Sequence, residues 1–157
     1  MSRVLLAILI TCAAPTAFGC SCLQPPDVQQ ALERSASVID ATVVALEDRN
    51  SGWRGIKLWF QHLFGQSPPS VPDDGLAVRL RVHEVWKGTA APELVVYTAR
   101  DSATCGFPFE VGRRYFIYSN RAADDAYSVS LCSRTRLKEE GEEEGATLDR
   151  LAESKAF

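Results

Sequence analysis

Hydrophobic and polar residues alternate along much of the chain, which is typical of β-strands with one buried face. The clearest case is 76–86, in which every second residue from Leu76 to Val82 is a branched apolar one. The alternation slips after Val82, so we expect a β-bulge near 83–84. Further strands are predicted at 38–46, 94–98 and 115–119, and at the alternating residues Tyr127, Val129 and Leu131. Five short strands predict a mainly β protein with a small closed or partly closed barrel, although this pattern alone also fits a sandwich.

Two short helices are expected to flank these strands. Two prolines precede Asp27 and open a helix over 27–34, whose apolar residues share one face: Val28, Ala31 and Leu32. At the other end, 138–157 combines an acidic linker with a short helix, whose apolar stripe is Leu148, Leu151 and Ala152. The linker contains five glutamates within 139–144, and we expect it to be solvated.

The segment 47–75 separates the first two strands and is longer than most loops, so it calls for an explanation. Its apolar residues follow helical spacing and form an aromatic stripe: Ile56, Trp59, Phe60, Leu63 and Phe64. The simplest interpretation is an amphipathic helix that packs on the barrel. The alternatives are a helix that contacts a partner protein or a membrane surface.

The first 19 residues have the features of an export signal. Arg3 precedes an apolar run over 4–14, and small residues at Ala17 and Gly19 then favour cleavage before Cys20. A membrane anchor is disfavoured because the run is shorter than the ~20 residues that span a bilayer. A bacterial lipoprotein signal is a rival interpretation, although Ala17 is a poor match to it, and this route would acylate Cys20.

Cleavage before Cys20 would leave four cysteines, Cys20, Cys22, Cys105 and Cys132, in the exported chain. Four cysteines in such a chain predict two disulfides, with three possible connectivities. A bridge between Cys20 and Cys22 would close a small strained ring and is the least favoured. The other two connectivities both tie the N-terminus to the second half of the chain.

Composition and motifs argue against nucleic-acid binding and against catalysis. The 157 residues fit one domain, and their net charge of −3 gives no basic footprint for nucleic acid. The two histidines, His62 and His83, are interpreted as surface residues, and no group of residues has zinc-ligand spacing. Cys20 and Cys22 lack the two-residue spacing of a redox motif. We therefore expect a protein that is not an enzyme and has no cofactor of its own.

Five local motifs together resemble the N-terminal inhibitory domain of the tissue inhibitors of metalloproteinases, within the netrin-like module family. They are Cys20-Ser21-Cys22 followed by Pro25-Pro26, the strand 37–44, Trp86-Lys87-Gly88, Val96-Tyr97-Thr98 leading to Cys105-Gly106-Phe107, and Ser130-Leu131-Cys132. The resemblance covers 20–136. The chain departs from the family at its third disulfide, because Leu32 stands where a cysteine is usual and no partner follows Cys132.

The resemblance implies a netrin-like barrel over 20–137, a five-stranded OB-like fold with the disulfides Cys20–Cys105 and Cys22–Cys132. It also implies that the free amine and the carbonyl oxygen of Cys20 chelate the catalytic zinc of a partner protease, whose open coordination position accepts such a ligand. Ser21 would enter the main specificity pocket of that protease, and Cys22 would belong to the same protease-binding segment. Ala103 and Thr104, which the bridge to Cys105 would hold beside the N-terminus, would widen the contact with the protease. The aromatic stripe within 56–64 would be a second contact.

The resemblance thus predicts a secreted or periplasmic inhibitor of zinc metalloendopeptidases. The alternative is a non-inhibitory netrin-like module that binds another protein, either secreted or lipid-anchored at the cell envelope, since a fold does not fix a function. Membrane contact is expected only if Cys20 is acylated or through the 56–64 helix. The state of the processed N-terminus separates the two hypotheses.

Overall fold

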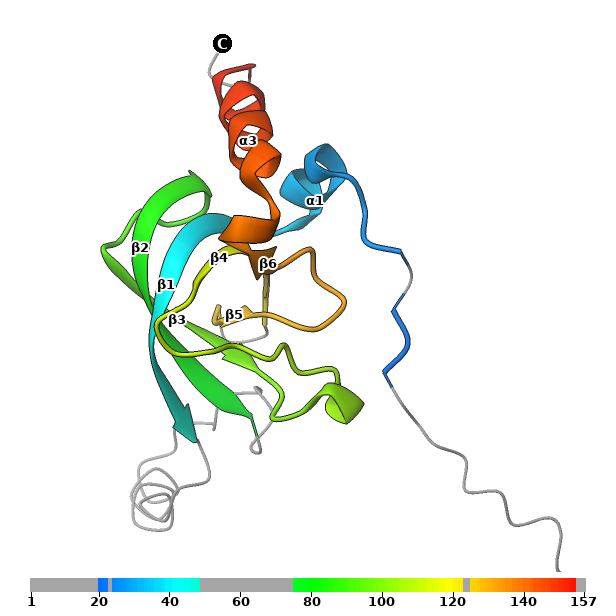
Figure 1. Cartoon of the computed structure of the whole chain (residues 1–157), viewed down its shortest axis with the longest axis vertical. Coiled ribbons are helices and arrows are strands. Elements are labelled where there is room, and N and C mark those ends of the chain that lie inside the picture. Colours follow the sequence, from blue (N-terminus) through cyan, green and yellow to red (C-terminus); the bar gives the residue numbers. More distant parts are fainter. Residues whose placement is uncertain (1–19, 23, 49–74, 123–124, 155–157) are drawn as a thin grey trace, which may run out of the picture.

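A closed five-stranded β-barrel forms the centre of the computed structural model, which describes residues 20–22, 24–48, 75–122 and 125–154 (Figure 1). Its strands are β1 (Ser37–Asp48), β2 (Leu76–Lys87), β3 (Glu93–Thr98), β4 (Arg114–Arg121) and β5 (Tyr127–Ser128). They are joined in the order β1-β2-β3-β5-β4, and β1 also pairs with β4, which closes the barrel. The predicted mainly β barrel is confirmed, and this closure excludes the sandwich.

The long strand β1 confirms the strand predicted at 38–46, and its pairing with β2 contains the expected bulge. Asp40 lies opposite Glu84 on β2. The next residue of β1, Ala41, lies opposite Val82. His83 is therefore the extra residue of the bulge, and the slip in alternation marked its place. Its imidazole Nε2 and the Thr42 hydroxyl are 2.8 Å apart.

Alternate residues of the strands fill the barrel, as the period of two requires. The interior consists of buried side chains from all five barrel strands and the loops beside them: Ile39, Ala41, Val43, Val78, Leu80, Val96, Phe109, Tyr115, Ile117, Tyr127 and Val129. Burial of one such large apolar side chain stabilises the fold by about 1.5–3 kcal/mol. The side chains of this cluster pack against one another in the barrel interior.

A second apolar cluster lies outside the barrel, beneath two helices. The helices α1 (Val28–Arg34) and α3 (Glu142–Ser154) lie side by side at one end of the barrel (Figure 1). Phe116 and Tyr118 point out of the barrel towards them, whereas Tyr115 and Ile117 of the same strand point in. Leu32 of α1 and Leu148 of α3 complete this cluster, and both are buried.

The motif Trp86-Lys87-Gly88 joins the end of β2 to both helices. The indole of Trp86 donates to Asp149 of α3 at 2.7 Å. Lys87 donates to the carbonyl oxygens of Leu32 and Glu33, which end α1. Gly88 has φ +101°, and a side chain there would collide with Ser37, so glycine is required. In this structure the motif therefore has a packing role.

Several sequence expectations need correction at the C-terminal end. A sixth strand, β6 (Arg136–Leu137), pairs with β4, and the 3₁₀ helix η2 (Lys138–Glu140) follows it. The helix α3 begins at Glu142, inside the stretch expected to be an acidic linker. Solvation of that stretch was expected throughout, but Glu144 is only 4% exposed. The predicted fifth strand is also shorter, since Val129 and Leu131 lie beyond the end of β5.

Candidate functional site

The N-terminal segment 20–22 is fastened to two distant loops by the two disulfides. Cys20 is bonded to Cys105 and Cys22 to Cys132, with Cα–Cα distances of 5.2 and 5.1 Å. The pairing implied by the family resemblance is therefore the one present. Each bridge closes a long loop, with sequence separations of 85 and 110, and can stabilise the fold by about 4–5 kcal/mol.

The turn that receives Cys20 is fixed by its own hydrogen bonds. The 3₁₀ helix η1 (Ser102–Thr104) is capped by Asp101, whose carboxylate accepts from the Thr104 amide at 2.9 Å and from the Thr104 hydroxyl at 3.0 Å. These hydrogen bonds hold the pKa of Asp101 below its ordinary value. Asp101 is thus an anionic cap at neutral pH, and it sets the shape of the turn that ends in Cys105.

Cys105 and Gly106 occupy unusual positions at the end of this turn. Cys105 is in the left-handed region, with φ 66°. A Cβ on Gly106 would lie 2.1 Å from the carbonyl oxygen of Ala99, so only glycine fits. The Gly106 amide donates to the Asp101 carbonyl at 2.7 Å. The backbone at Cys105 is therefore held closely, and the half-cystine that anchors Cys20 has a defined direction.

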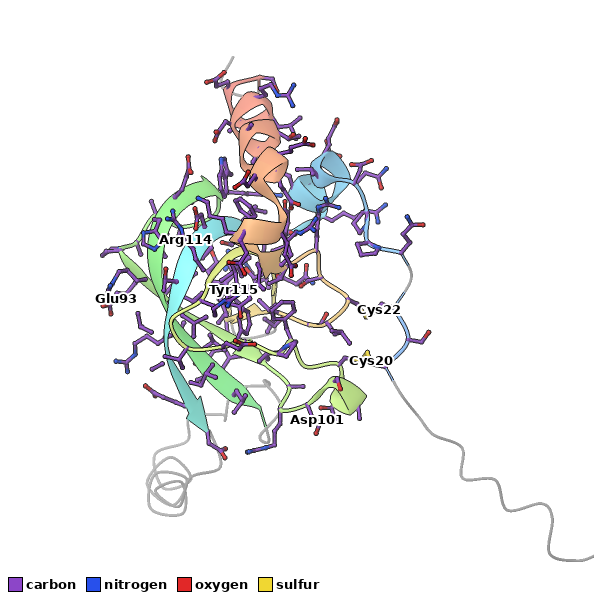
Figure 2. All side chains as sticks on the ribbon, viewed as in Figure 1. Cys20, Cys22, Glu93, Asp101, Arg114 and Tyr115 are labelled. Carbon is purple, nitrogen blue, oxygen red and sulfur yellow. A yellow bond between two sulfur atoms is a disulfide. The ribbon has the colours of Figure 1, made fainter. Side chains whose placement is uncertain are left out.

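The exposed side chains at this edge come from three segments, near Cys20, Cys22 and Asp101 in Figure 2. Ser21 is exposed between the two half-cystines, and Ala103 and Thr104 are exposed on η1. Leu131, which lies next to Cys132, is 37% exposed although it is a large apolar residue. Its amide donates to the Cys105 carbonyl at 2.8 Å, which joins the two loops. We call residues 20–22, 102–105 and 131–132 the N-terminal edge.

The exposure of Leu131 is a feature of this edge that the sequence did not indicate. Its alternation with Val129 predicted a strand position with a buried side chain. The chain instead leaves the sheet after Ser128, and Leu131 reaches the surface beside the Cys22–Cys132 bridge. The neighbouring half-cystine Cys132 was the one local signal that the chain there belongs to the edge.

A third tether restrains the N-terminal segment after the two disulfides. Arg134 donates to the carbonyl oxygen of Pro26 at 2.7 Å and binds the buried carboxylate of Glu144 with its other nitrogens. The segment between Cys22 and α1 is thereby connected to α3. The arrangement is chemically suited to presenting the backbone of Cys20 and Ser21 in one fixed geometry, because a preorganised group loses less entropy when it binds.

A separate charged cluster lies on the barrel away from this edge, near Arg114 in Figure 2. Asp40 is fully buried and accepts from Arg114 at 2.6 and 2.7 Å and from Lys138. Burial by itself raises the pKa of Asp40, but the hydrogen bonds and charges of Arg114 and Lys138 outweigh it and hold that pKa below its ordinary value. This cluster, a buried carboxylate with two partly exposed cations, joins β1, β4 and η2.

Among residues 20–22, 24–48, 75–122 and 125–154, one group of metal-ligating atoms lies close together. It consists of the sulfur atoms of Cys20, Cys22 and Cys132, which lie within 4.8 Å of one another. All three are in disulfides and so are not thiolate ligands. The proposed metal ligands at Cys20 are backbone atoms, so this result leaves that hypothesis as it was.

Two sequence predictions lie outside the described residues. They are the signal over 1–19 and the aromatic stripe of Ile56, Trp59, Phe60, Leu63 and Phe64. The interpretation of the 56–64 segment therefore stays a prediction.

Comparison with known proteins leaves the family undecided. No protein-family model matches this chain. No curated protein matches it either. The likeness to the tissue inhibitors of metalloproteinases therefore rests on the five motifs. The disulfides independently indicate a compartment outside the reducing cytoplasm. No helix among the described residues is long and apolar enough to cross a bilayer.

Proposed function

We propose that this protein is a secreted inhibitor of zinc metalloendopeptidases that acts through the N-terminal edge. The observation that carries the proposal is the disulfide from Cys20 to Cys105, since it fixes the residue that becomes the N-terminus after signal cleavage. The exposed Ser21 and the exposed turn at Ala103 and Thr104 lie on the same edge and support it.

The chemistry follows from a catalytic zinc that keeps one coordination position for water. The α-amine nitrogen and the carbonyl oxygen of Cys20 are close enough in the covalent structure to act as a bidentate ligand. Together they would displace that water and leave the partner enzyme without its nucleophile. The sulfur of Cys20 takes no part, because it is already bonded to Cys105. Ser21 would then point into the neighbouring specificity pocket.

The N-terminal edge also offers side chains that can contact the partner protease outside its zinc site. Leu131 adds an exposed apolar side chain, and Ala103 adds a small one. The two disulfides and the Arg134 tether keep these groups on a single rigid frame, so binding orders few side chains. Rigid contact of this kind is typical of tight protease inhibitors.

The decisive experiment alters the α-amine and leaves the fold intact. The mature protein is prepared with one alanine added before Cys20 and is titrated against a zinc endopeptidase beside the unextended protein. We expect the extension to abolish inhibition because it removes the amine from the chelating position. A matched control carries one alanine after Phe157, and its potency should equal that of the unextended protein.

Two outcomes would overturn the proposal. Equal inhibition by the protein extended before Cys20 would exclude chelation by the amine. N-terminal analysis and intact mass of the exported protein provide the second test, since an acyl group on Cys20 or cleavage at another position removes the ligand. Acylation would favour the alternative, a lipid-anchored module that binds another protein.

A further inference from the structure

The two disulfides contact each other. The Sγ atoms of Cys20 and Cys132 belong to different bridges and are 3.8 Å apart. Cys22 Sγ lies within 4.8 Å of both. This separation is close to the contact distance of two sulfur atoms, so nothing stands between the bridges. A sulfur released from one bridge would therefore already touch the other.

The two bridges also differ in accessibility. Cys22 and Cys132 are exposed, whereas Cys20 and Cys105 are half-buried. A thiol in solution therefore reaches the Cys22–Cys132 bridge first. Exchange requires a thiolate that attacks a disulfide sulfur, and its rate depends on access to that sulfur. The Cys22–Cys132 bridge should therefore react first because it is exposed, and the Cys20–Cys105 bridge second because it contacts Cys132.

We propose that the four cysteines form one thiol–disulfide exchange site, in which a dithiol attacks Cys22–Cys132 and Cys132 then attacks Cys20. In the first step a thiolate of the dithiol bonds to Cys22 and releases Cys132 as a thiolate. The Cys132 thiolate bonds to Cys20, and Cys105 leaves as a thiolate that takes up a proton. The second thiolate of the dithiol then displaces Cys22 from the mixed disulfide.

These three steps together transfer two electrons from the dithiol to the protein. The dithiol is oxidised to its disulfide, and the protein passes from two disulfides to one disulfide and two thiols. The remaining bridge is Cys20–Cys132, and the free thiols are Cys22 and Cys105. Forming that bridge requires the two sulfurs to close from 3.8 Å to about 2 Å. The N-terminus stays tied to the 131–132 loop but is released from the η1 turn.

The exchange does not depend on protease inhibition. If the proposed function holds, however, the exchange moves the Cys20 amine away from Ala103 and Thr104, and inhibition falls. The disulfide exchange is measured by mapping the cysteines and the inhibition by a protease assay, so failure of one proposal is distinguishable from failure of the other.

The test uses two serine variants of the mature protein. Cys22→Ser leaves Cys132 as a thiol against the Cys20–Cys105 bridge, and Cys132→Ser leaves Cys22 as the thiol. Each is incubated at about pH 8 without reductant, alkylated and mapped by mass spectrometry. We expect Cys22→Ser to carry label on both Cys105 and Cys132, and a Cys20–Cys132 crosslink to be found. In Cys132→Ser the label should stay on Cys22, since a Cys20–Cys22 ring is strained.

Equal labelling of Cys105 in the two variants would overturn the proposal. A second measurement avoids any folding defect of the variants. The unaltered protein is treated with a small excess of dithiothreitol, quenched with acid and mapped. The singly reduced species should contain Cys20–Cys132, with Cys22 and Cys105 free. Recovery of Cys20–Cys105, with Cys22 and Cys132 free, would show that the bridges react independently.

Discussion

The guanidinium of Arg134 binds both carboxylate oxygens of Glu144, at 3.0 and 3.1 Å. Glu144 is almost fully buried, with 3% of its side chain exposed, and Arg134 is 19% exposed. The Tyr118 hydroxyl donates to the same carboxylate at 2.5 Å. Burial raises the pKa of Tyr118, and the negative charge of Glu144 raises it further, so the hydroxyl keeps its proton. This cluster attaches α3 to the barrel and to the N-terminal segment.

Removal of the Glu144 carboxylate is expected to destabilise the protein strongly. Glu144→Ala leaves Nε and Nη2 of Arg134 and the Tyr118 hydroxyl without their acceptor, and loss of one partner of a buried pair costs about 3–5 kcal/mol. Urea unfolding measures the change. The matched control is Glu143→Ala, one residue earlier on α3 and exposed, which should change stability by less than about 0.5 kcal/mol. Similar losses in the two variants would contradict this account.

The buried carboxylate of Asp40, held by Arg114 and Lys138, predicts how stability depends on pH. Its pKa in the folded state is below the value of about 3.9 in the unfolded chain. The stabilisation is therefore fully present above about pH 4 and is lost as the pH falls through the lower folded value. Asp40→Asn should lower the free energy of unfolding by about 2 kcal/mol at neutral pH. In the variant, the free energy of unfolding should also fall less steeply as the pH is lowered.

The control for Asp40 is Asp125→Asn. Asp125 pairs with Arg121 but is 86% exposed, and exposed pairs contribute about 0–1 kcal/mol. Its φ of 60° also suits asparagine. Urea unfolding at several pH values should therefore give the unaltered profile for Asp125→Asn. An unchanged acid profile in Asp40→Asn would show that the acid sensitivity has another origin.

Two glycines should respond differently to alanine. Gly112 has φ +85° but open space around it. Gly112→Ala should therefore lower the free energy of unfolding by about 1–2 kcal/mol, the cost of placing alanine in the left-handed region. Gly106→Ala would place a methyl group 2.1 Å from the backbone oxygen of Ala99 and should cost clearly more. Thermal or urea unfolding ranks the two variants. The reverse order would mean that the turn at Cys105 can shift to admit a side chain.

The proposed chelation predicts that inhibition weakens in acid. The α-amine must be neutral to bind zinc, and its ordinary pKa is about 7.7–8.0. Between about pH 8 and pH 6 the neutral fraction falls roughly forty-fold, and the inhibition constant should rise by a similar factor. The assay needs an endopeptidase active at both values. A small inhibitor whose zinc-binding group does not titrate in this range serves as the control, and equal potency of the protein at both values would contradict chelation by the amine.

The strands could be predicted because their signal is local. Alternation from Leu76 to Val82 depends only on the two faces of a strand, and the slip that followed correctly marked the bulge at His83. Arg136 and Leu137 form a strand too short to show any period, so β6 was missed. Leu131 followed the alternation but lies outside the sheet, because its amide is hydrogen-bonded to the Cys105 carbonyl and the next residue, Cys132, is bonded to Cys22.

What the sequence by itself determined is the pattern of strands and their flanking helices and, once the predicted signal is removed, a count of four cysteines that predicts two bridges, since periodicity, capping residues and composition act between near neighbours along the chain. Only the tertiary structure decided which cysteines pair, that Glu144 is buried in a stretch composed like a solvated linker, and that the two bridges meet at Cys20 and Cys132. These features join residues up to 112 positions apart, and no local pattern carries the distance between them.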